Sequence, residues 1–103
     1  MVTDTVMGTG AEAVPGKTVV VNYVGRLENG QVFDASESHG QPFSFVLGSG
    51  QVIPGWEEGI QGMKVGGKRT LVVPPEKAYG AQAVGPIPAN STLIFDVELL
   101  EVR

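Results

Sequence analysis

Apolar side chains alternate with polar ones along several short segments of this chain, and glycine or proline ends most of these segments. The alternation is clearest near the C-terminus, where Leu93, Phe95, Val97 and Leu99 fall at every second position. A period of two residues is that of a β-strand with one buried face. We therefore expect a strand-rich domain in which glycine and proline mark the turns.

The same pattern predicts the other strands. Residues 18–27 are rich in β-branched and aromatic side chains, and residues 32–34 resume the pattern after an Asn-Gly pair that tolerates positive φ. Residues 18–34 are therefore predicted to form a hairpin. Further strands are expected over 43–47, 68–74 and 93–100.

Only one segment has a helical period. Trp56, Ile60 and Met63 are spaced i, i+4 and i+7, and a proline begins the segment, so a helix of about two turns is predicted over 54–63. Strands before and after one short helix favour an α+β fold, with a curved antiparallel β-sheet curled over that helix, rather than a parallel βαβ arrangement.

Size, charge and composition narrow the possible functions. The 103 residues suit a single domain spanning residues 1–103, and 7 Lys plus Arg against 11 Asp plus Glu give a net charge of −4. Such a charge argues against nucleic acid or an anionic membrane as a partner. No cysteine and one histidine leave a zinc site without ligands, so no metal and no cofactor is expected.

The single histidine, His39, stands between Ser38 and Gly40 and is predicted to be an ordinary loop residue. On that interpretation, activity should show no histidine titration. No apolar run reaches the ~20 residues of a membrane-spanning helix, and the first residues lack the pattern of a secretory signal. We therefore expect a cytoplasmic protein.

One motif resembles a phosphate-binding loop. Residues 62–68 read G-x-x-x-x-G-K, but Arg69 stands where Ser or Thr should hold magnesium, and the segment runs from helix to strand rather than from strand to helix. Nucleotide binding is therefore not predicted. Lys64, Lys68 and Arg69 are interpreted as a solvated turn. Residues 76–91 have no clear period, and a connection of that length is usually functional or mobile.

The seven aromatic residues allow two interpretations. They could all be core, and we assign Phe45 there. However, Tyr23 and Tyr79 carry hydroxyl groups that need partners if buried, and Asp34 directly follows Phe33. Aromatic walls with a few polar groups are typical of a ligand pocket.

Five segments form a set of motifs in a fixed order: residues 21–36, Pro42-Phe43, residues 52–59, residues 78–80 and residues 93–100. Together they closely resemble the FKBP-type peptidyl-prolyl cis/trans isomerases, and the compact bacterial single-domain members in particular. The resemblance covers nearly all of residues 15–102. It implies a curved sheet (half-barrel) wrapped around one short helix, with a pocket between them.

The resemblance also implies roles for individual residues. Trp56 would form the pocket floor under the substrate proline, the Ile53 N–H and the Tyr79 hydroxyl would bond ligand carbonyls, and Asp34 would lie near Tyr23 and face the bound imide. Catalysis would depend on Asp34, Tyr79, Phe33 and Tyr23. The implied substrate-binding residues are Tyr23, Phe33, Asp34, Phe43, Val52, Ile53, Trp56, Tyr79, Ile87 and Phe95.

The implied function is isomerisation of X-Pro bonds in unfolded or flexible polypeptide by a monomer that assists protein folding. Tacrolimus- or rapamycin-like macrolides would act as inhibitors through the same pocket. The alternative is a non-catalytic module or chaperone that only holds a proline-containing segment, since the same floor and walls would serve both functions.

Overall fold

The computed structural model describes residues 2–103 and contains one six-stranded antiparallel sheet. The strand order is β1-β5-β6-β2-β3, and β4 pairs with β2. Within residues 2–103 no helix is long and apolar enough to cross a bilayer. The strands are β1 (Val2–Val6), β2 (Thr18–Leu27), β3 (Val32–Ala35), β4 (Phe43–Val46), β5 (Lys68–Val73) and β6 (Leu93–Val102).

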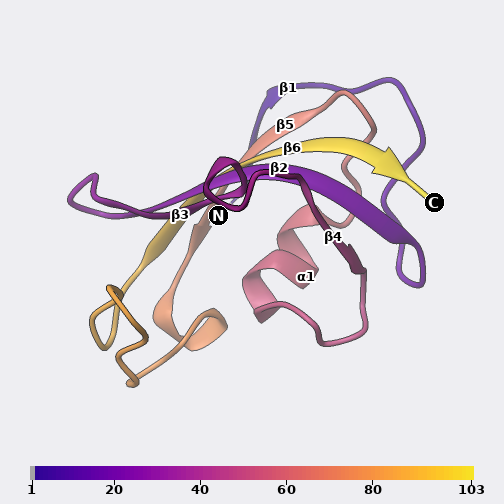
Figure 1. Cartoon of the computed structure of the whole chain (residues 1–103). Helices are drawn as coiled ribbons and strands as arrows, with labels where there is room; N and C mark the ends of the chain where they lie inside the picture. The colour runs from indigo at the N-terminus through magenta and orange to yellow at the C-terminus, as the bar shows by residue number, and fades with distance from the viewer. Residues whose placement is uncertain (1) are drawn as a thin grey trace.

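One α-helix, α1 (Pro54–Ile60), lies under the concave side of the curved sheet (Figure 1). Two short 3₁₀ helices, η1 (Ser36–His39) and η2 (Pro75–Lys77), follow β3 and β5. This architecture confirms the predicted α+β fold with an antiparallel sheet and one short helix. The predicted hairpin at 18–34 and the three later strands are confirmed as well.

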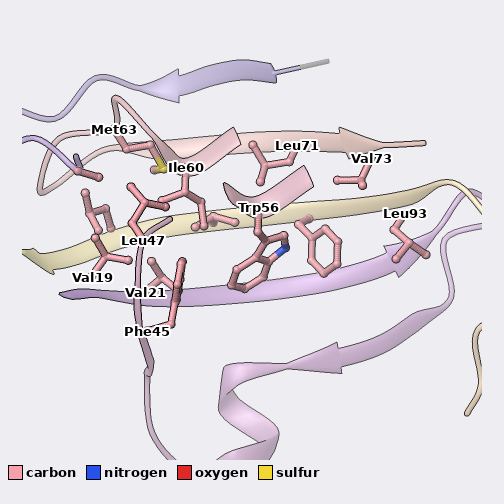
Figure 2. Packing of buried hydrophobic residues seen from close by; sticks show 14 of the residues in the cluster. Val19, Val21, Phe45, Leu47, Trp56, Ile60, Met63, Leu71, Val73 and Leu93 are labelled. Carbon is pink, nitrogen blue, oxygen red and sulfur yellow. The ribbon is translucent and has the colours of Figure 1, made fainter. Parts of the chain in front are cut away.

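The core lies between α1 and the inner face of the sheet. The long strands β2 and β6 pair along nearly their full length, from Val19 opposite Val102 to Leu27 opposite Leu93. Their alternating apolar residues point inward and meet Trp56 and neighbouring core residues (Figure 2). Phe45 is 3% exposed and belongs to this core, as predicted.

The helix is shorter than its apolar period predicts. It ends at Ile60, and Gln61 takes an extended conformation. Met63 is nevertheless buried, because the chain beyond the helix pairs with Ala13: the Gly62 N–H donates to the Ala13 carbonyl at 2.9 Å, and the Ala13 N–H donates to the Met63 carbonyl at 2.7 Å. The spacing therefore predicted burial correctly, but tertiary hydrogen bonds replace the last helical turn.

The edge of the sheet differs from the sequence prediction in two ways. Strand β1 was not predicted, because all its residues are exposed and no apolar alternation marks it.

The second difference concerns Arg69, which was assigned to a solvated turn; this assignment is wrong. Its side chain is only 13% exposed, with Nε donating to Asp4 Oδ1 at 2.6 Å and Nη1 donating to the Gly59 and Gln61 carbonyls at 2.9 and 3.1 Å. Arg69 thus satisfies carbonyls at the end of α1 and ties β1 to it.

Two glycines let α1 approach β5 closely. A Cβ atom at Gly55 would lie 2.4 Å from Val73 Cγ1, and one at Gly59 would lie 2.7 Å from Leu71 Cδ2. Both distances are far below van der Waals contact, so any larger residue would push the helix away from the strand. Helix position, and with it the depth of Trp56, therefore depends on the absence of these two side chains.

We expect Gly55→Ala to lower the free energy of unfolding by up to about 2 kcal/mol. The added methyl group meets Val73, which is 1% exposed and stiff at χ1, and overpacking of this kind costs about 1–3 kcal/mol, against a helix-propensity gain of roughly 1 kcal/mol. Urea unfolding is the measurement. In the background of Val73→Ala the substitution should cost much less, and Glu58→Ala is the control on the exposed side of the helix. Equal effects of Gly55→Ala in both backgrounds would contradict the steric argument.

Candidate functional site

A pocket of about 670 Å³ opens between the concave face of the sheet and α1. Its walls are mostly aromatic and aliphatic, with a few polar side chains among them. Such a combination is typical of a site for a small or extended apolar ligand. The lining residues are Tyr23, Phe33, Asp34, Ser36, His39, Gln41, Pro42, Phe43, Gln51, Val52, Ile53, Trp56, Tyr79 and Phe95.

Trp56 is the residue around which the other rings are arranged. Its indole is 5% exposed and is met edge-on by Tyr23 at 5.0 Å and by Phe95 at 5.3 Å between ring centroids, with interplanar angles of 78° and 89°. Phe43 approaches at 6.1 Å and 72°. Near-perpendicular pairs are favourable aromatic contacts, and here they set three rings as walls around the indole.

Gly25 makes room for one of these walls, and sequence reasoning missed it. Phe33 and Phe95 pack edge to face at 5.7 Å across this position of β2. A Cβ atom at Gly25 would lie 2.7 Å from Phe33 Cζ and 2.8 Å from Phe95 Cε1. A glycine inside a strand is a signal of such a close approach, so the sequence did contain the clue.

Asp34 is held at the pocket by three hydrogen bonds. The Tyr23 hydroxyl donates to Oδ2 at 2.7 Å, and the Ala35 N–H and His39 Nε2 each lie 2.9 Å from Oδ1. Burial raises the pKa of Asp34, but the hydrogen bonds from Tyr23, His39 and Ala35 outweigh burial and lower this pKa below its ordinary value. Burial, followed by the bond to Asp34, raises the pKa of Tyr23 well above its usual range. The pocket therefore contains a carboxylate and a neutral phenol at neutral pH.

The interpretation of His39 as an ordinary loop residue is wrong. It ends η1, lines the pocket and contacts Asp34. The 3₁₀ helix is fixed by Ser36, which is 2% exposed: its Oγ accepts the Tyr23 N–H at 3.1 Å and lies 3.2 Å from Asn22 Oδ1. Sequence periodicity could not find this contact, because it depends on a side-chain hydrogen bond between η1 and β2.

Several donors of the lining residues have no partner within residues 2–103, among them the buried Trp56 Nε1, the Ile53 N–H and the Tyr79 hydroxyl. The Ile53 N–H precedes the first turn of α1, and the Tyr79 hydroxyl belongs to a side chain that is 39% exposed. Both residues line the pocket. They can therefore donate to the carbonyl groups of a bound ligand without breaking an internal hydrogen bond.

The structure brings together nine of the ten residues proposed from the sequence resemblance, and Ile87 is the exception. Ile87 is 6% exposed, belongs to the core cluster and is not among the residues that line the pocket. Its backbone forms a bridge with Val84, which folds the 84–87 turn back on itself and turns Ile87 inward. Lining residues that were not proposed from the sequence are Ser36, His39, Gln41, Pro42 and Gln51.

Comparison with known proteins identifies the same family throughout. The family model for FKBP-type peptidyl-prolyl cis-trans isomerases matches residues 10–100. The FK506-binding protein of Neisseria meningitidis is 57% identical over 96 residues, which are 92% of this chain and 88% of that protein. FK506-binding protein 4 of Aspergillus fumigatus is 54% identical over 100 residues, which are 97% of this chain and 20% of that protein. The chain thus spans about a fifth of the length of that fungal relative.

Solved structures agree with these relatives. AtFKBP13 superposes with a TM-score of 0.93 at 45% identity, covering 99% of this chain and 91% of that chain. FkpA from Escherichia coli superposes with a TM-score of 0.90 at 51% identity, covering 99% of this chain and 47% of that chain.

We expect Asp34 to stabilise the fold in a pH-dependent way. Because its folded-state pKa is lowered, its contribution is fully present above the ordinary value of about 3.9 and is lost as pH falls through the lower folded value. The difference in unfolding free energy between the wild type and Asp34→Asn should therefore shrink from pH 5 to pH 2.5. Urea unfolding at each pH is the measurement.

The control is Glu28→Gln, a carboxylate in the β2–β3 turn whose side chain has no ion pair or hydrogen bond within residues 2–103. This variant should follow the wild-type curve. A wild-type to Asp34→Asn difference that stays constant over the same pH range would show that the three hydrogen bonds do not favour the ionised form.

Proposed function

The chain belongs to the FKBP-type peptidyl-prolyl cis-trans isomerase family, and we propose that it catalyses cis/trans isomerisation of X-Pro bonds in unfolded or flexible polypeptide segments and so assists protein folding. The observation that supports this most is the pocket itself. Trp56 lies between three ring walls, and two donors without internal partners, the Ile53 N–H and the Tyr79 hydroxyl, face the same space.

The reaction needs no nucleophile, because no bond is broken. The X-Pro barrier of about 18–20 kcal/mol is mainly amide resonance, which is lost when the amide is twisted. A proline ring placed against the Trp56 indole would bring its amide into an apolar surrounding. That surrounding disfavours the polar planar amide relative to the less dipolar twisted one, and so lowers the barrier.

The polar groups would act by position. The Ile53 N–H and the Tyr79 hydroxyl would hold the substrate carbonyls on either side of the ring, so that the rest of the peptide is fixed while the X-Pro bond turns. Asp34 has its carboxylate fixed by three hydrogen bonds, and it holds the Tyr23 ring in the wall through one of them. None of these roles requires a proton to leave the protein.

A ligand that presents an apolar ring and carbonyl groups in the same arrangement would occupy the same pocket. We therefore propose that tacrolimus- or rapamycin-like macrolides bind here and inhibit the enzyme; the relatives from Neisseria meningitidis and Aspergillus fumigatus are named for FK506 binding. A location in the cytoplasm and a monomeric state, both inferred from the sequence, stay predictions. The alternative of a module that holds a proline segment without catalysis uses the same walls and is decided by the following assay.

At substoichiometric concentration the protein should accelerate cis/trans exchange of a short Leu-Pro peptide, measured by NMR exchange or by protease-coupled isomerisation. Tyr79→Phe should lower kcat/KM about two- to tenfold, because one hydrogen bond is worth about 0.5–1.5 kcal/mol. It should leave urea unfolding unchanged, since the hydroxyl has no internal partner. Val32→Ala, at an exposed position outside the pocket, is the control. If the folded protein leaves exchange at the rate in buffer, the non-catalytic module is the correct function.

Trp56 allows a direct test of where a macrolide binds, because it is the only tryptophan. Its indole lines the pocket, so tacrolimus should change the intrinsic emission saturably at one molecule per chain, and the same titration should abolish peptide isomerisation. A short proline peptide at high concentration should reverse the change. Tight binding by calorimetry without any change in emission would place the macrolide elsewhere on the protein.

A further inference from the structure

We propose that His39 is a specificity-determining residue whose charge decides which residues beside the proline the pocket accepts. When the imidazole is protonated, an acidic residue next to the proline is tolerated. When it is neutral, the carboxylate of Asp34 repels an acidic residue and favours a basic one. The inference rests on the proposed isomerase function and adds to it a dependence on pH and on substrate charge.

The contact between His39 and Asp34 fixes which ring nitrogen carries hydrogen. Nε2 lies 2.9 Å from Asp34 Oδ1, and an ionised carboxylate can only accept a hydrogen bond. Nε2 therefore donates whether or not the ring is charged. Nδ1 has no partner within residues 2–103, so it is the atom that gains or loses the proton. Protonation thus changes the charge at the pocket without breaking the bond that positions the ring.

The local structure keeps the imidazole at the pocket in both states. Residue Ser36 anchors the start of η1 to β2, and Gly40, with a φ of 73°, closes its end by donating its N–H to the Glu37 carbonyl at 3.1 Å. The His39 side chain is 60% exposed, so protons and a bound peptide both reach it. Imidazole groups change charge between about pH 5 and 8.

No other positive charge competes with His39 at the pocket. None of the described residues that line it is Lys or Arg, and the only carboxylate among them is Asp34 on β3. Tyr23 on β2 contributes a neutral phenol. Glu37 on η1 lines a separate depression on the outer face of the sheet, and Arg26 on β2 pairs with Asp96 on β6. The charge of the lining therefore changes from −1 to zero when His39 is protonated.

A change of one charge has a modest effect at an exposed rim. At a separation of about 7 Å and an effective dielectric constant of about 60, it changes the affinity for a singly charged side chain roughly threefold. Acidic and basic residues respond in opposite directions, so the ratio of their rates changes by up to about tenfold.

The test uses peptides that differ only in one residue beside proline, which is Glu, Gln or Lys. One series varies the residue before proline and a second the residue after it, and kcat/KM is measured from pH 5.5 to pH 8.5 at constant low ionic strength. In at least one series the Glu/Gln ratio should be about threefold higher at pH 5.5 than at pH 8.5, and the Lys/Gln ratio should move in the opposite direction. The midpoint should match the NMR titration of the imidazole, which is unambiguous because the chain has one histidine.

Three variants separate the charge of His39 from its hydrogen bond. His39→Gln keeps a donor but cannot titrate, so its ratios should not change with pH. His39→Arg carries a permanent charge, so its ratios at pH 8.5 should resemble those of the wild type at pH 5.5. Glu37→Gln is the matched control on the same 3₁₀ helix and should keep the wild-type pH dependence. Ratios that are flat with pH in both wild-type series, or equally pH-dependent in His39→Gln, would overturn the inference.

The experiment also distinguishes failure of the inference from failure of the proposed function. If no peptide is isomerised, the function is wrong, and the dissociation constants of the same peptides are then measured through Trp56 emission over the same pH range. A pH-dependent Glu/Lys affinity ratio that is absent in His39→Gln would support the role of His39 in a binding module. A ratio that does not change with pH would overturn both proposals.

Discussion

The contact between α1 and β5 determines how the rest of this small domain is arranged. Gly55 and Gly59 lie one helical turn apart and face Val73 and Leu71, where even a methyl group would clash. The helix can therefore lie close under the sheet, and Trp56, which is adjacent to Gly55, is held at a fixed depth. Arg69 secures the same contact from the other end by binding carbonyls where α1 ends. Both the closed core and the open pocket follow from this placement.

Some of the side chains that form the core also line the pocket. Trp56 and Phe95 are 5% exposed and belong to the core cluster, yet both line the pocket. The pocket is thus an unfilled end of the core rather than a depression added to its surface. A ring bound there would be surrounded by rings that are already packed against each other, so little side-chain entropy would be lost on binding. The same arrangement means that large changes to these walls also disturb folding.

The sequence predicted the parts of the fold that depend on period, and it failed where tertiary contacts decide. Alternation located β2, β4, β5 and β6, which all contain buried residues, and β3 was found because the pattern resumes after the Asn-Gly pair. All residues of β1 are exposed, and this strand was missed. The spacing of Trp56, Ile60 and Met63 predicted burial correctly, but hydrogen bonds to Ala13 end the helix earlier. The walls were proposed from a family resemblance; Ile87 turned inward because a local backbone bridge, which has no signal in composition, sets its direction.

The polar groups of the pocket were the least predictable, and the reason is physical. Asp34 stays ionised because Tyr23, Ala35 and His39 all donate to it, and these donors come from β2, β3 and η1. Ala35 is adjacent to Asp34 and Tyr23 meets it through the β2–β3 pairing, but His39 reaches it from η1, which Ser36 fixes against β2, and no periodic pattern indicates that contact. The pocket walls are formed by apolar side chains, and replacing these side chains would disturb the core. The charge beside Asp34, in contrast, belongs to an exposed side chain on a short 3₁₀ helix, so substitution at position 39 can alter charge preference while the aromatic framework stays intact.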